Sequence, residues 1–329
     1  MTVNENSKPL LTVKGLKQYF KVSNNYTVHA VENVSFQIYP GETYGLVGES
    51  GSGKSTTGRS IIRLYDPTAG EINFNGMDIS GRINKANSQA LRTQMQMIFQ
   101  DPMASLNPRK KVRDIIGEGL DIHHMYKTRA EREEKIKNIL AKVGLAPEHA
   151  GRYPHQFSGG QRQRIGIARS LAVHPKFVVC DEAVSALDVS IQSQIINLLL
   201  DLKEQNNLTY LFISHDLSVI KYISDRIGVM YLGNMMELSD TEHLFAHPYH
   251  PYTEALLSAI PTTDVDGRKE TIILEGDIPS PINPPKGCKF HTRCRYCTEI
   301  CKNVTPQFEE VEPGHFVACH HKLGVPEEK

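Results

Sequence analysis

The sequence has no net charge with which to attract a charged partner. Its 329 residues carry 37 basic and 37 acidic side chains, so the formal charge cancels. This balance removes any overall electrostatic attraction for nucleic acid or anionic lipid, and we expect no nucleic-acid partner. A hydrophobic content of 40% is nevertheless enough to build the core of a globular protein.

Two further features are missing, a secretory leader and an apolar run long enough to span a membrane. The chain begins with "MTVNENSKPL", which has no apolar core. Its longest largely apolar stretch, "IGVMYLGNMM" from Ile227, is about half a membrane span. We find no internal repeat. These features predict a cytoplasmic protein.

Cysteine is scarce except near the end of the chain. Five of the six cysteines lie in roughly the last eighth of the sequence, namely Cys288, Cys294, Cys297, Cys301 and Cys319. In a reducing compartment such a cluster favours metal binding over disulfide formation. The spacing matches no single mononuclear zinc motif, but four of the thiolates could hold zinc. Three thiolates could also do so with one histidine taken from His291, His315, His320 and His321.

The order of apolar patterns predicts an α/β protein. Between Leu10 and Gly76, short β-type runs alternate with turn signals and predict an antiparallel element. A helical stretch follows, "RAEREEKIKNILAKVGL", with apolar residues at helical spacing. Buried-type strands that begin at Phe177 and Tyr210 then flank another helical stretch, which is the βαβ order of a parallel sheet.

A change of composition after Pro261 predicts a domain boundary. The segment "PTTDVDGRKE" is typical of a linker, and the proline-rich "IPSPINPPKG" leads into the cysteine cluster. We therefore divide the chain into residues 1–261 and a small C-terminal extension, residues 262–329.

A glycine-rich motif predicts a nucleotide site. "GLVGESGSGKST" contains a full G-x-x-x-x-G-K-S match directly after an apolar run. The glycines let backbone N–H groups face inward, and the helix that begins near Gly53 adds its positive end to a phosphate nest. Lys54 is expected to reach the β and γ phosphates of ATP, and Ser55 to bind Mg²⁺. The residues assigned to this loop are Gly48, Ser50, Gly51, Ser52, Gly53, Lys54, Ser55 and Thr56.

Two carboxylates follow a buried-type strand farther along the chain. In "FVVCDEAVSALD", Asp181 and Glu182 come after four apolar residues, at the end of the strand where α/β sites lie. Asp181 is suited to the Mg²⁺ shell. Glu182 is suited to polarising an attacking water, because hydrolytic phosphoryl transfer needs an acceptor in line with the γ phosphorus.

The order of these motifs resembles the ATP-binding cassette (ABC) family. "FSGGQRQRIGIARSLA" from Phe157 lies between the phosphate loop and the acidic strand, and "MIFQDP", "SALD" and "ISHD" occur in the family's order. The resemblance covers most of residues 10–260. It implies a P-loop ABC ATPase cassette with a parallel sheet core, an antiparallel β subdomain and a helical subdomain.

The resemblance implies roles for further residues. The helix at the signature stretch would cap the γ phosphate bound on a partner subunit. Its residues are Ser158, Gly159, Gly160 and Gln161. Gln100 would reach Mg²⁺ or the attacking water, and His215 would hold the γ phosphate from the far side. Asp188 would link the two sites of a dimer, and Phe20, with Tyr19 as the alternative, would stack on adenine.

One position departs from the family pattern. The family usually has proline after the catalytic glutamate, whereas Ala183 follows Glu182 here. The loss of a fixed φ costs about 0.5–1 kcal/mol of local preorganisation. We expect this to change the rate of hydrolysis without removing the activity.

Within the family, further segments resemble the ATP-binding subunits of oligopeptide and dipeptide importers. They include "HPYHPYTEALLSAIP" and "GDIPSPINPPKGC". The resemblance implies an ATPase that powers peptide import from the cytoplasmic face of the membrane, where it would be peripheral and bound to two permease subunits. An extracytoplasmic peptide-binding protein would deliver the cargo. Because the chain has one P-loop and one signature stretch, it also needs a second cassette, commonly a related but different chain. ATP binding would close the cassette dimer, and hydrolysis would reset it.

Three other functions remain open at this stage. The chain could be a soluble ABC-type ATPase that acts on nucleic acid or ribosomes, a redox sensor, or an importer subunit for a non-peptide cargo such as nickel. The first is disfavoured because the chain lacks a long coiled coil and paired cassettes, and because its charge is balanced.

The resemblance also bears on the cysteines. In such importer subunits four cysteines recur, matching Cys288, Cys294, Cys301 and Cys319, and some members hold a [4Fe-4S] cluster there. We favour this cluster over zinc, with Cys297 as the extra residue and free thiols as the alternative. Its anionic charge would be offset by the basic neighbours Lys289, Arg293 and Arg295. The role would be structural, fastening a tail too small to form its own core.

Overall fold

The computed structural model describes residues 8–23, 26–260 and 271–324. The linker predicted after Pro261, and with it the boundary at residue 262, lies outside the described residues. Within them, no helix is long and apolar enough to cross a membrane.

The core of the molecule is an eight-stranded sheet with the order β11-β12-β10-β9-β3-β8-β7-β6. Five neighbouring strands run parallel. They are β9 (Arg226–Tyr231), β3 (Thr43–Val47), β8 (Thr209–Ile213), β7 (Phe177–Asp181) and β6 (Met95–Ile98). Every residue of β3, β7 and β8 is buried, as expected for parallel strands covered on both faces. This confirms the predicted parallel sheet.

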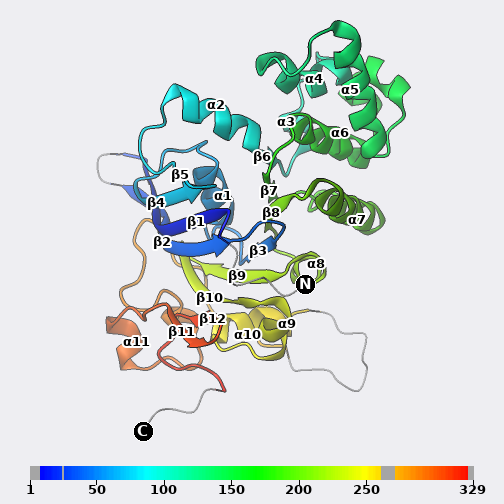
Figure 1. Ribbon diagram of the computed structural model, residues 1–329. Helices are drawn as coiled ribbons and strands as arrows, with labels where there is room; N and C mark the ends of the chain where they lie inside the picture. Colours follow the sequence, from blue (N-terminus) through cyan, green and yellow to red (C-terminus); the bar gives the residue numbers. More distant parts are fainter. Residues whose placement is uncertain (1–7, 24–25, 261–270, 325–329) are drawn as a thin grey trace.

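A second sheet, of four antiparallel strands, has the order β2-β1-β4-β5. Its strands are β1 (Leu11–Lys21), β2 (Thr27–Ile38), β4 (Ala69–Phe74) and β5 (Met77–Asp78). In Figure 1 this sheet, drawn in blue tones, lies next to α1 (Lys54–Ile61). The antiparallel element predicted from residues 10–76 is therefore present.

The middle of the chain forms a helical region that Figure 1 shows in green, apart from the antiparallel sheet. It consists of α3 (Pro102–Ser105), α4 (Val112–Ile122), α5 (Arg129–Lys142) and α6 (Gly159–Leu171), with short 3-10 turns at Pro147–Gly151 and Pro154–Gln156. Helix α5 begins where Thr128 accepts a hydrogen bond from the N–H of Glu131. Its buried residues, Ile136, Ile139 and Leu140, are those of the predicted apolar face.

The remaining helices connect or flank strands of the main sheet. They are α2 (Lys85–Gln94), α7 (Val189–Asn206), α8 (Leu217–Ile223), α9 (Thr241–Ala246) and α10 (Pro251–Ser258). Helix α7 joins β7 to β8 and completes the βαβ unit predicted from the sequence. These features confirm an α/β fold.

The C-terminal segment extends the main sheet. Strand β10 (Asn234–Asp240) pairs antiparallel with β9, and β12 (His315–Val317) and β11 (Glu309–Glu312) follow in order. The segment also contains a 3-10 turn, His291–Arg293, and α11 (Glu299–Asn303).

The same segment contributes to the main core. Cys288, Phe290 and Cys301 are buried in the cluster that contains Tyr231 and Tyr252. The Phe290 ring lies 5.3 Å from that of Tyr231 and 5.2 Å from that of Tyr252, measured between centroids. The described part of the segment thus shares the core of the preceding chain, and the division at residue 262 stays a prediction.

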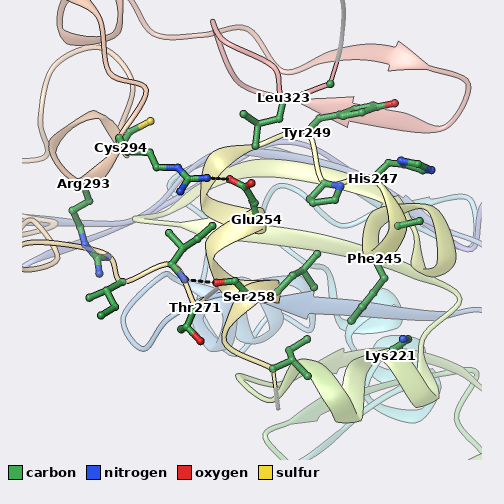
Figure 2. A pocket seen from close by; sticks show the side chains of 18 of the residues that line it. Lys221, Phe245, His247, Tyr249, Glu254, Ser258, Thr271, Arg293, Cys294 and Leu323 are labelled. Carbon is green, nitrogen blue, oxygen red and sulfur yellow. Dashed lines mark hydrogen bonds and ion pairs between the residues drawn. The ribbon is translucent and has the colours of Figure 1, made fainter. Parts of the chain in front are cut away.

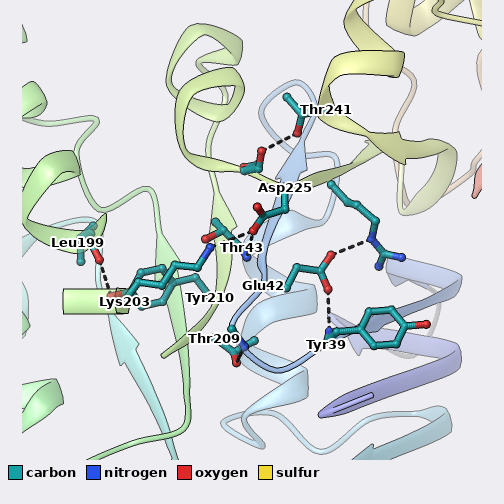
Figure 3. A network of polar contacts seen from close by, with 12 residues as sticks. Tyr39, Glu42, Thr43, Leu199, Lys203, Thr209, Tyr210, Asp225 and Thr241 are labelled. Atoms are coloured by element: carbon teal, nitrogen blue, oxygen red, sulfur yellow. Dashed lines mark hydrogen bonds and ion pairs between the residues drawn. The ribbon is translucent and has the colours of Figure 1, made fainter. Parts of the chain in front are cut away.

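Polar contacts hold the main sheet at the end where β3 begins (Figure 3). The carboxylate of Asp225 accepts hydrogen bonds from the N–H of Thr43 at 2.7 Å and from Nζ of Lys203 at 2.9 Å. The buried Glu42 accepts from Arg226 at 2.8 Å. These contacts fix the start of β3 against β9 and α7, which supports the strand that leads into the glycine-rich loop.

Candidate functional site

The glycine-rich loop follows β3 and leads into α1, as predicted. Lys54 is buried and its Nζ donates to the carbonyl oxygens of Gly48 at 2.7 Å and Glu49 at 3.0 Å. Burial lowers the pKa of Lys54, and the nearby carboxylates of Glu182, Asp181 and Glu49 oppose that shift. The ammonium group therefore lies near Asp181 and Glu182, the two acidic residues that the sequence assigned to ATP hydrolysis.

Two glycines of this loop are required by close approach of the backbone. Gly48 has φ 146°, and a Cβ there would lie 2.1 Å from the carbonyl oxygen of Met230. Gly53 has φ 98°, and a Cβ there would lie 2.3 Å from the carbonyl oxygen of Ala30. The loop therefore packs closely against β2 and β9. Its N–H groups and the start of α1 are suited to bind an anion.

Ser55 and Asp181 meet although 126 residues separate them. The hydroxyl of Ser55 donates to Oδ1 of Asp181 at 2.5 Å, and Nη2 of Arg59 donates to Oδ2 at 3.1 Å. Asp181 is 1% exposed. A hydroxyl and a carboxylate oxygen in contact are the two protein ligands expected for Mg²⁺ beside a phosphate loop, so the residues present fit this ion.

The three residues assigned to catalysis also lie together. Nε2 of Gln100 donates to Oε2 of Glu182 at 2.7 Å, and Nδ1 of His215 lies 3.5 Å from Oε1 of the same carboxylate. Glu182 has φ 48°, a left-handed conformation that is uncommon for a residue with a side chain. Such local strain clusters at functional sites, and here it turns the carboxylate toward Gln100 and His215.

The signature stretch lies elsewhere on the surface. Ser158 begins α6, and its hydroxyl accepts from the N–H of Gln161 at 3.3 Å, while Oε1 of Gln161 accepts from the N–H of Ser158 at 3.1 Å. Ser158 and Gly159 are exposed. Within the described residues, no hydrogen bond joins this stretch to the phosphate loop of the same chain, and its role in binding an anion stays a prediction.

Two predicted site residues have evident structural roles. A Cβ on Gly160 would lie 2.4 Å from Cγ2 of Ile191, so glycine is needed for α6 to approach α7. Asp188 caps α7 by accepting from the N–H of Ile191 at 3.2 Å. The roles that the family resemblance gives these residues at a dimer interface stay predictions.

Both candidates for stacking on adenine pack against other side chains of the chain. The Phe20 ring packs edge-on against Tyr65, with centroids 5.2 Å apart. The Tyr19 ring lies 4.3 Å from that of His29, and its hydroxyl donates to Glu32 at 2.5 Å. Both rings therefore have neighbours within the chain, and the choice of Phe20 stays a prediction.

Sequence reasoning missed a contact between the C-terminal segment and the phosphate loop. Arg293 donates to both carboxylate oxygens of Glu49, from Nη1 at 2.6 Å and from Nη2 at 3.2 Å. The N–H of Glu49 donates to the hydroxyl of Tyr252 at 2.9 Å. The only signal was a charged residue at a variable position of the loop motif, which does not reveal a partner 244 residues away.

The cysteines of the C-terminal segment share one neighbourhood. Burial, together with the nearby thiols of Cys288, Cys294 and Cys301, raises the pKa of Cys319 to about 12. Cys297 belongs to the same neighbourhood, because it contributes to the raised pKa of Cys294. Within the described chain, however, no three sulfur atoms lie within 4.8 Å of one another.

One expectation about this cluster needs correction. The basic residues do not face the thiols as free charges, because Arg293 pairs with Glu49, Arg295 with Glu254, and Lys289 donates to a carbonyl oxygen. Each histidine offered as a zinc ligand has a partner for one ring nitrogen, but a histidine has a second ring nitrogen, so these alternatives stay predictions. These partners are the carbonyl oxygen of Cys288 for His291, Glu237 for His315, the carbonyl oxygen of Val304 for His320, and Thr298 for His321.

A cleft of about 1380 Å³ lies between the C-terminal segment and helices α8 to α10 (Figure 2). Arg295 pairs with Glu254 at 2.9 Å in its wall. No residue of the phosphate loop lines it. The cleft is therefore separate from the residues assigned to ATP.

Comparison with known protein families gives two matches. The ABC transporter family matches residues 31–185, which span the phosphate loop, the signature stretch and the acidic strand. The family described as "Oligopeptide/dipeptide transporter, C-terminal region" matches residues 236–301, which include α10 and four of the clustered cysteines.

Curated relatives match nearly the whole chain. The oligopeptide transport ATP-binding protein AppF of Bacillus subtilis is 56% identical over 323 residues, which cover 96% of this chain and 98% of the relative. A putative peptide import ATP-binding protein of Brucella ovis is 54% identical and covers 94% and 97%, respectively. The oligopeptide transport ATP-binding protein OppF of Bacillus subtilis is 54% identical and covers 95% and 97%.

Solved structures share the fold. A dimeric, post-hydrolysis state of the ATP-binding cassette MJ0796, bound to ADP and Pi, has a TM-score of 0.64 and 27% identity, and covers 70% of this chain and 98% of that one. The protein cbiO1 of Clostridium perfringens, part of the ABC transporter complex cbiONQ, has a TM-score of 0.64 and 25% identity, and covers 73% and 92%.

Proposed function

The chain belongs to the family of ATP-binding subunits of oligopeptide ABC transporters, and from this premise we propose that it hydrolyses ATP to power the import of peptides. The observation that carries the proposal is the meeting of Gln100, Glu182 and His215 beside the phosphate loop. The named relatives are peptide transport proteins, so neither a soluble ATPase acting on nucleic acid or ribosomes nor a nickel importer is favoured.

The geometry suggests how the chain's own residues act on ATP. Lys54 would exchange its loop carbonyls for the β and γ phosphates, and Ser55 and Asp181 would hold Mg²⁺. The ion, when bound, neutralises charge on the phosphate oxygens. Glu182 would accept the proton of the attacking water, while Gln100 and His215 hold its carboxylate in place.

A second cassette would complete the site. The exposed N-terminal end of α6 offers the N–H of Gly159 and the hydroxyl of Ser158 to an anion, but it makes no hydrogen bond to the phosphate loop among the described residues. A phosphate bound on a partner chain would satisfy these donors. We expect the partner to be a related, different chain, and ATP to close the pair.

A groove beside Gln100 suits a membrane subunit. Its volume is about 840 Å³, and it lies between α2, β6 and the start of the helical region. The lining includes Phe99 and Gln100, and also Ile122, which is 65% exposed. A helix end of a permease seated here would touch Gln100 directly, which would couple the permease to the catalytic carboxylate.

This assignment implies a location and further partners. Two permease subunits would hold the chain peripherally on the cytoplasmic face of the membrane, and an extracytoplasmic binding protein would deliver peptide. The test is co-purification from membranes, followed by reconstitution in vesicles with peptide and binding protein. We expect peptide uptake that requires ATP and is lost in Lys54→Ala. Uptake unchanged in that variant, or co-purification with DNA or ribosomes instead of a permease, would overturn the proposal.

The cysteine cluster suits a [4Fe-4S] cluster better than zinc. Four thiolates around zinc would lie about 3.8 Å apart, as follows from Zn–S bonds of about 2.3 Å. Among the described residues no three cysteine sulfur atoms lie within 4.8 Å of one another, whereas in a cubane cluster each thiolate binds a different iron atom. Without a metal these groups would be neutral thiols at pH 7, because burial raises the pKa of Cys294 to about 11 and that of Cys319 to about 12.

The test of this cluster is anaerobic purification followed by metal analysis and a visible spectrum. We expect iron, brown absorbance, and loss of both in Cys294→Ser but not in Cys297→Ser. Stoichiometric zinc without absorbance would refute the cluster. Iron lost in Cys297→Ser but kept in Cys294→Ser would refute the ligand set.

A further inference from the structure

A second group of metal-ligating side chains lies away from both the phosphate loop and the cysteines. It consists of His243 on α9, Glu312 at the end of β11 and His315 at the start of β12. One ligand atom from each lies within 4.8 Å of the other two. Of these three residues the sequence singled out His315 alone, as a possible partner of the cysteines.

His315 is held as metal-ligating histidines commonly are. Its Nε2 lies 2.7 Å from Oε1 of Glu237, and the two side chains are 1% and 0% exposed. Glu237 also accepts from the N–H of Tyr249 at 2.7 Å and from the N–H of His250 at 3.0 Å. A carboxylate with these donors is an acceptor, so Nε2 of His315 carries the proton, in the carboxylate–histidine arrangement that supports metal ligands.

The other ring nitrogen of His315 is left without a partner. Nδ1 is buried and, among the described residues, has no hydrogen bond. Because the proton is on Nε2, Nδ1 presents a lone pair, and a buried acceptor without a partner costs about 1–3 kcal/mol. A metal ion would satisfy it.

His243 and Glu312 approach each other in a way that also suits a shared ion. Nε2 of His243 lies 3.0 Å from Oε2 of Glu312, yet the buried nitrogen has no hydrogen bond within the described chain. The hydroxyl of Tyr249, labelled in Figure 2, donates to Oε1 of Glu312 at 2.7 Å and so leaves Oε2 available. Glu312 is 46% exposed, which gives an ion and its water a route from solvent.

We propose that His243, Glu312 and His315 bind a divalent transition metal ion of the zinc class, with water as the fourth ligand. Two imidazoles and one carboxylate suit Zn²⁺, whereas Ca²⁺ and Mg²⁺ prefer oxygen ligands only. Glu237 and Tyr249 are positioning residues that hold His315 and Glu312.

Such an ion would fasten the C-terminal hairpin to the rest of the chain. Strands β11 and β12 have four and three residues, and β12 pairs with β10 through two residue pairs, Glu237 with Val317 and Leu238 with Phe316. So short a ladder is weak by itself. The ion would join both strands to α9, next to the segment that carries the cysteines.

The experiment uses the untagged, full-length chain, stripped of metal and dialysed against Zn²⁺. Because the cysteines can also bind zinc, the measured quantity is the difference between the wild-type chain and variants that retain every cysteine. We expect one equivalent fewer in His243→Ala and in Glu312→Gln, or an affinity about 100-fold or more weaker at that site. Co²⁺ bound there should show no thiolate charge-transfer band.

Matched variants keep the test decisive. His155→Ala removes an exposed histidine that lies outside both this group and the C-terminal segment, and it should bind as much zinc as the wild-type chain. Zinc should raise the melting temperature of the wild-type chain more than that of His243→Ala. Equal zinc binding and equal thermal shifts in wild type, His243→Ala and Glu312→Gln would overturn the proposal. His315→Ala would leave the buried Glu237 without its histidine partner and can fail to fold. The test therefore rests on His243→Ala and Glu312→Gln, whose side chains are more exposed.

Discussion

The ion pair between Arg293 and Glu49 predicts that the C-terminal segment controls the charge of the phosphate loop. Arg293 is 7% exposed as a side chain and Glu49 is 26% exposed, and two hydrogen bonds join them. The perturbation is Arg293→Ala. It removes the guanidinium group and leaves a carboxylate between two residues of the motif that must hold a triphosphate.

The expected size follows from the partial burial of the pair. An exposed pair contributes about 0–1 kcal/mol, whereas removal of one partner from a buried pair costs about 3–5 kcal/mol. Because Glu49 can be partly rehydrated, we expect Arg293→Ala to destabilise the chain by about 1–3 kcal/mol. The unpaired negative charge should also weaken ATP binding by about 5- to 10-fold, which corresponds to about 1–1.4 kcal/mol.

The assay is titration of the purified chain with ATP by calorimetry, together with denaturant unfolding. Glu49→Gln combined with Arg293→Ala should restore most of the ATP affinity, because the double variant has no unpaired charge. Arg295→Ala is the matched control, since this half-exposed arginine pairs with Glu254 outside the loop. An ATP affinity of Arg293→Ala within twofold of that of Arg295→Ala would refute the reasoning, as would a double variant no better than Arg293→Ala.

Two further predictions concern the signature stretch and a buried histidine. Ser158→Arg should leave the ATP affinity of the isolated chain nearly unchanged but abolish hydrolysis at the ATP site that the signature stretch completes on the partner chain. A loss of ATP binding as large as in Lys54→Ala would contradict this role of the signature stretch at the partner's site. Burial lowers the pKa of His250 to about 4, whereas an unfolded histidine titrates near 6.5. As the pH falls, the unfolded state therefore binds the proton first, and the folded state loses stability. Unfolding measured at pH 7.5 and pH 5 should differ by about 2 kcal/mol from this group, and His250→Asn, which can still accept from the N–H of Tyr252, should remove that difference. An equal pH dependence in the wild-type chain and in His250→Asn would show that His250 has the same pKa in the folded and unfolded states, which would contradict the prediction.

Much of the nucleotide site could be predicted from the sequence because its parts are local. The loop from Gly48 to Ser55 needs particular residues at fixed spacing, and Asp181 and Glu182 end a strand whose burial is evident from its apolar run. The parallel strands also have a simple pattern. These local patterns indicate the candidate phosphate-binding and catalytic residues without knowledge of any long-range contact.

Contacts between distant segments were not predictable in the same way. The pairing of Arg293 with Glu49 joins residues 244 positions apart, and that of His315 with Glu237 joins residues 78 apart. Each depends on how the C-terminal segment packs on β9 and β10, which short strands such as β11 and β12 do not reveal. The sequence also suggested that basic side chains surround the cysteines, because neighbours in sequence were taken as neighbours in space.

The central claim, that Glu182 positions the water for ATP hydrolysis, is tested most directly in the assembled transporter. The measurement is the rate of ATP hydrolysis by Glu182→Gln, in a complex whose partner cassette has its own catalytic glutamate replaced. We predict that ATP binding is kept and that hydrolysis falls by about 10²-fold or more relative to the complex with Glu182 intact, because Gln cannot accept the proton. Near-normal hydrolysis by this complex would contradict the account and would transfer the role of base to His215.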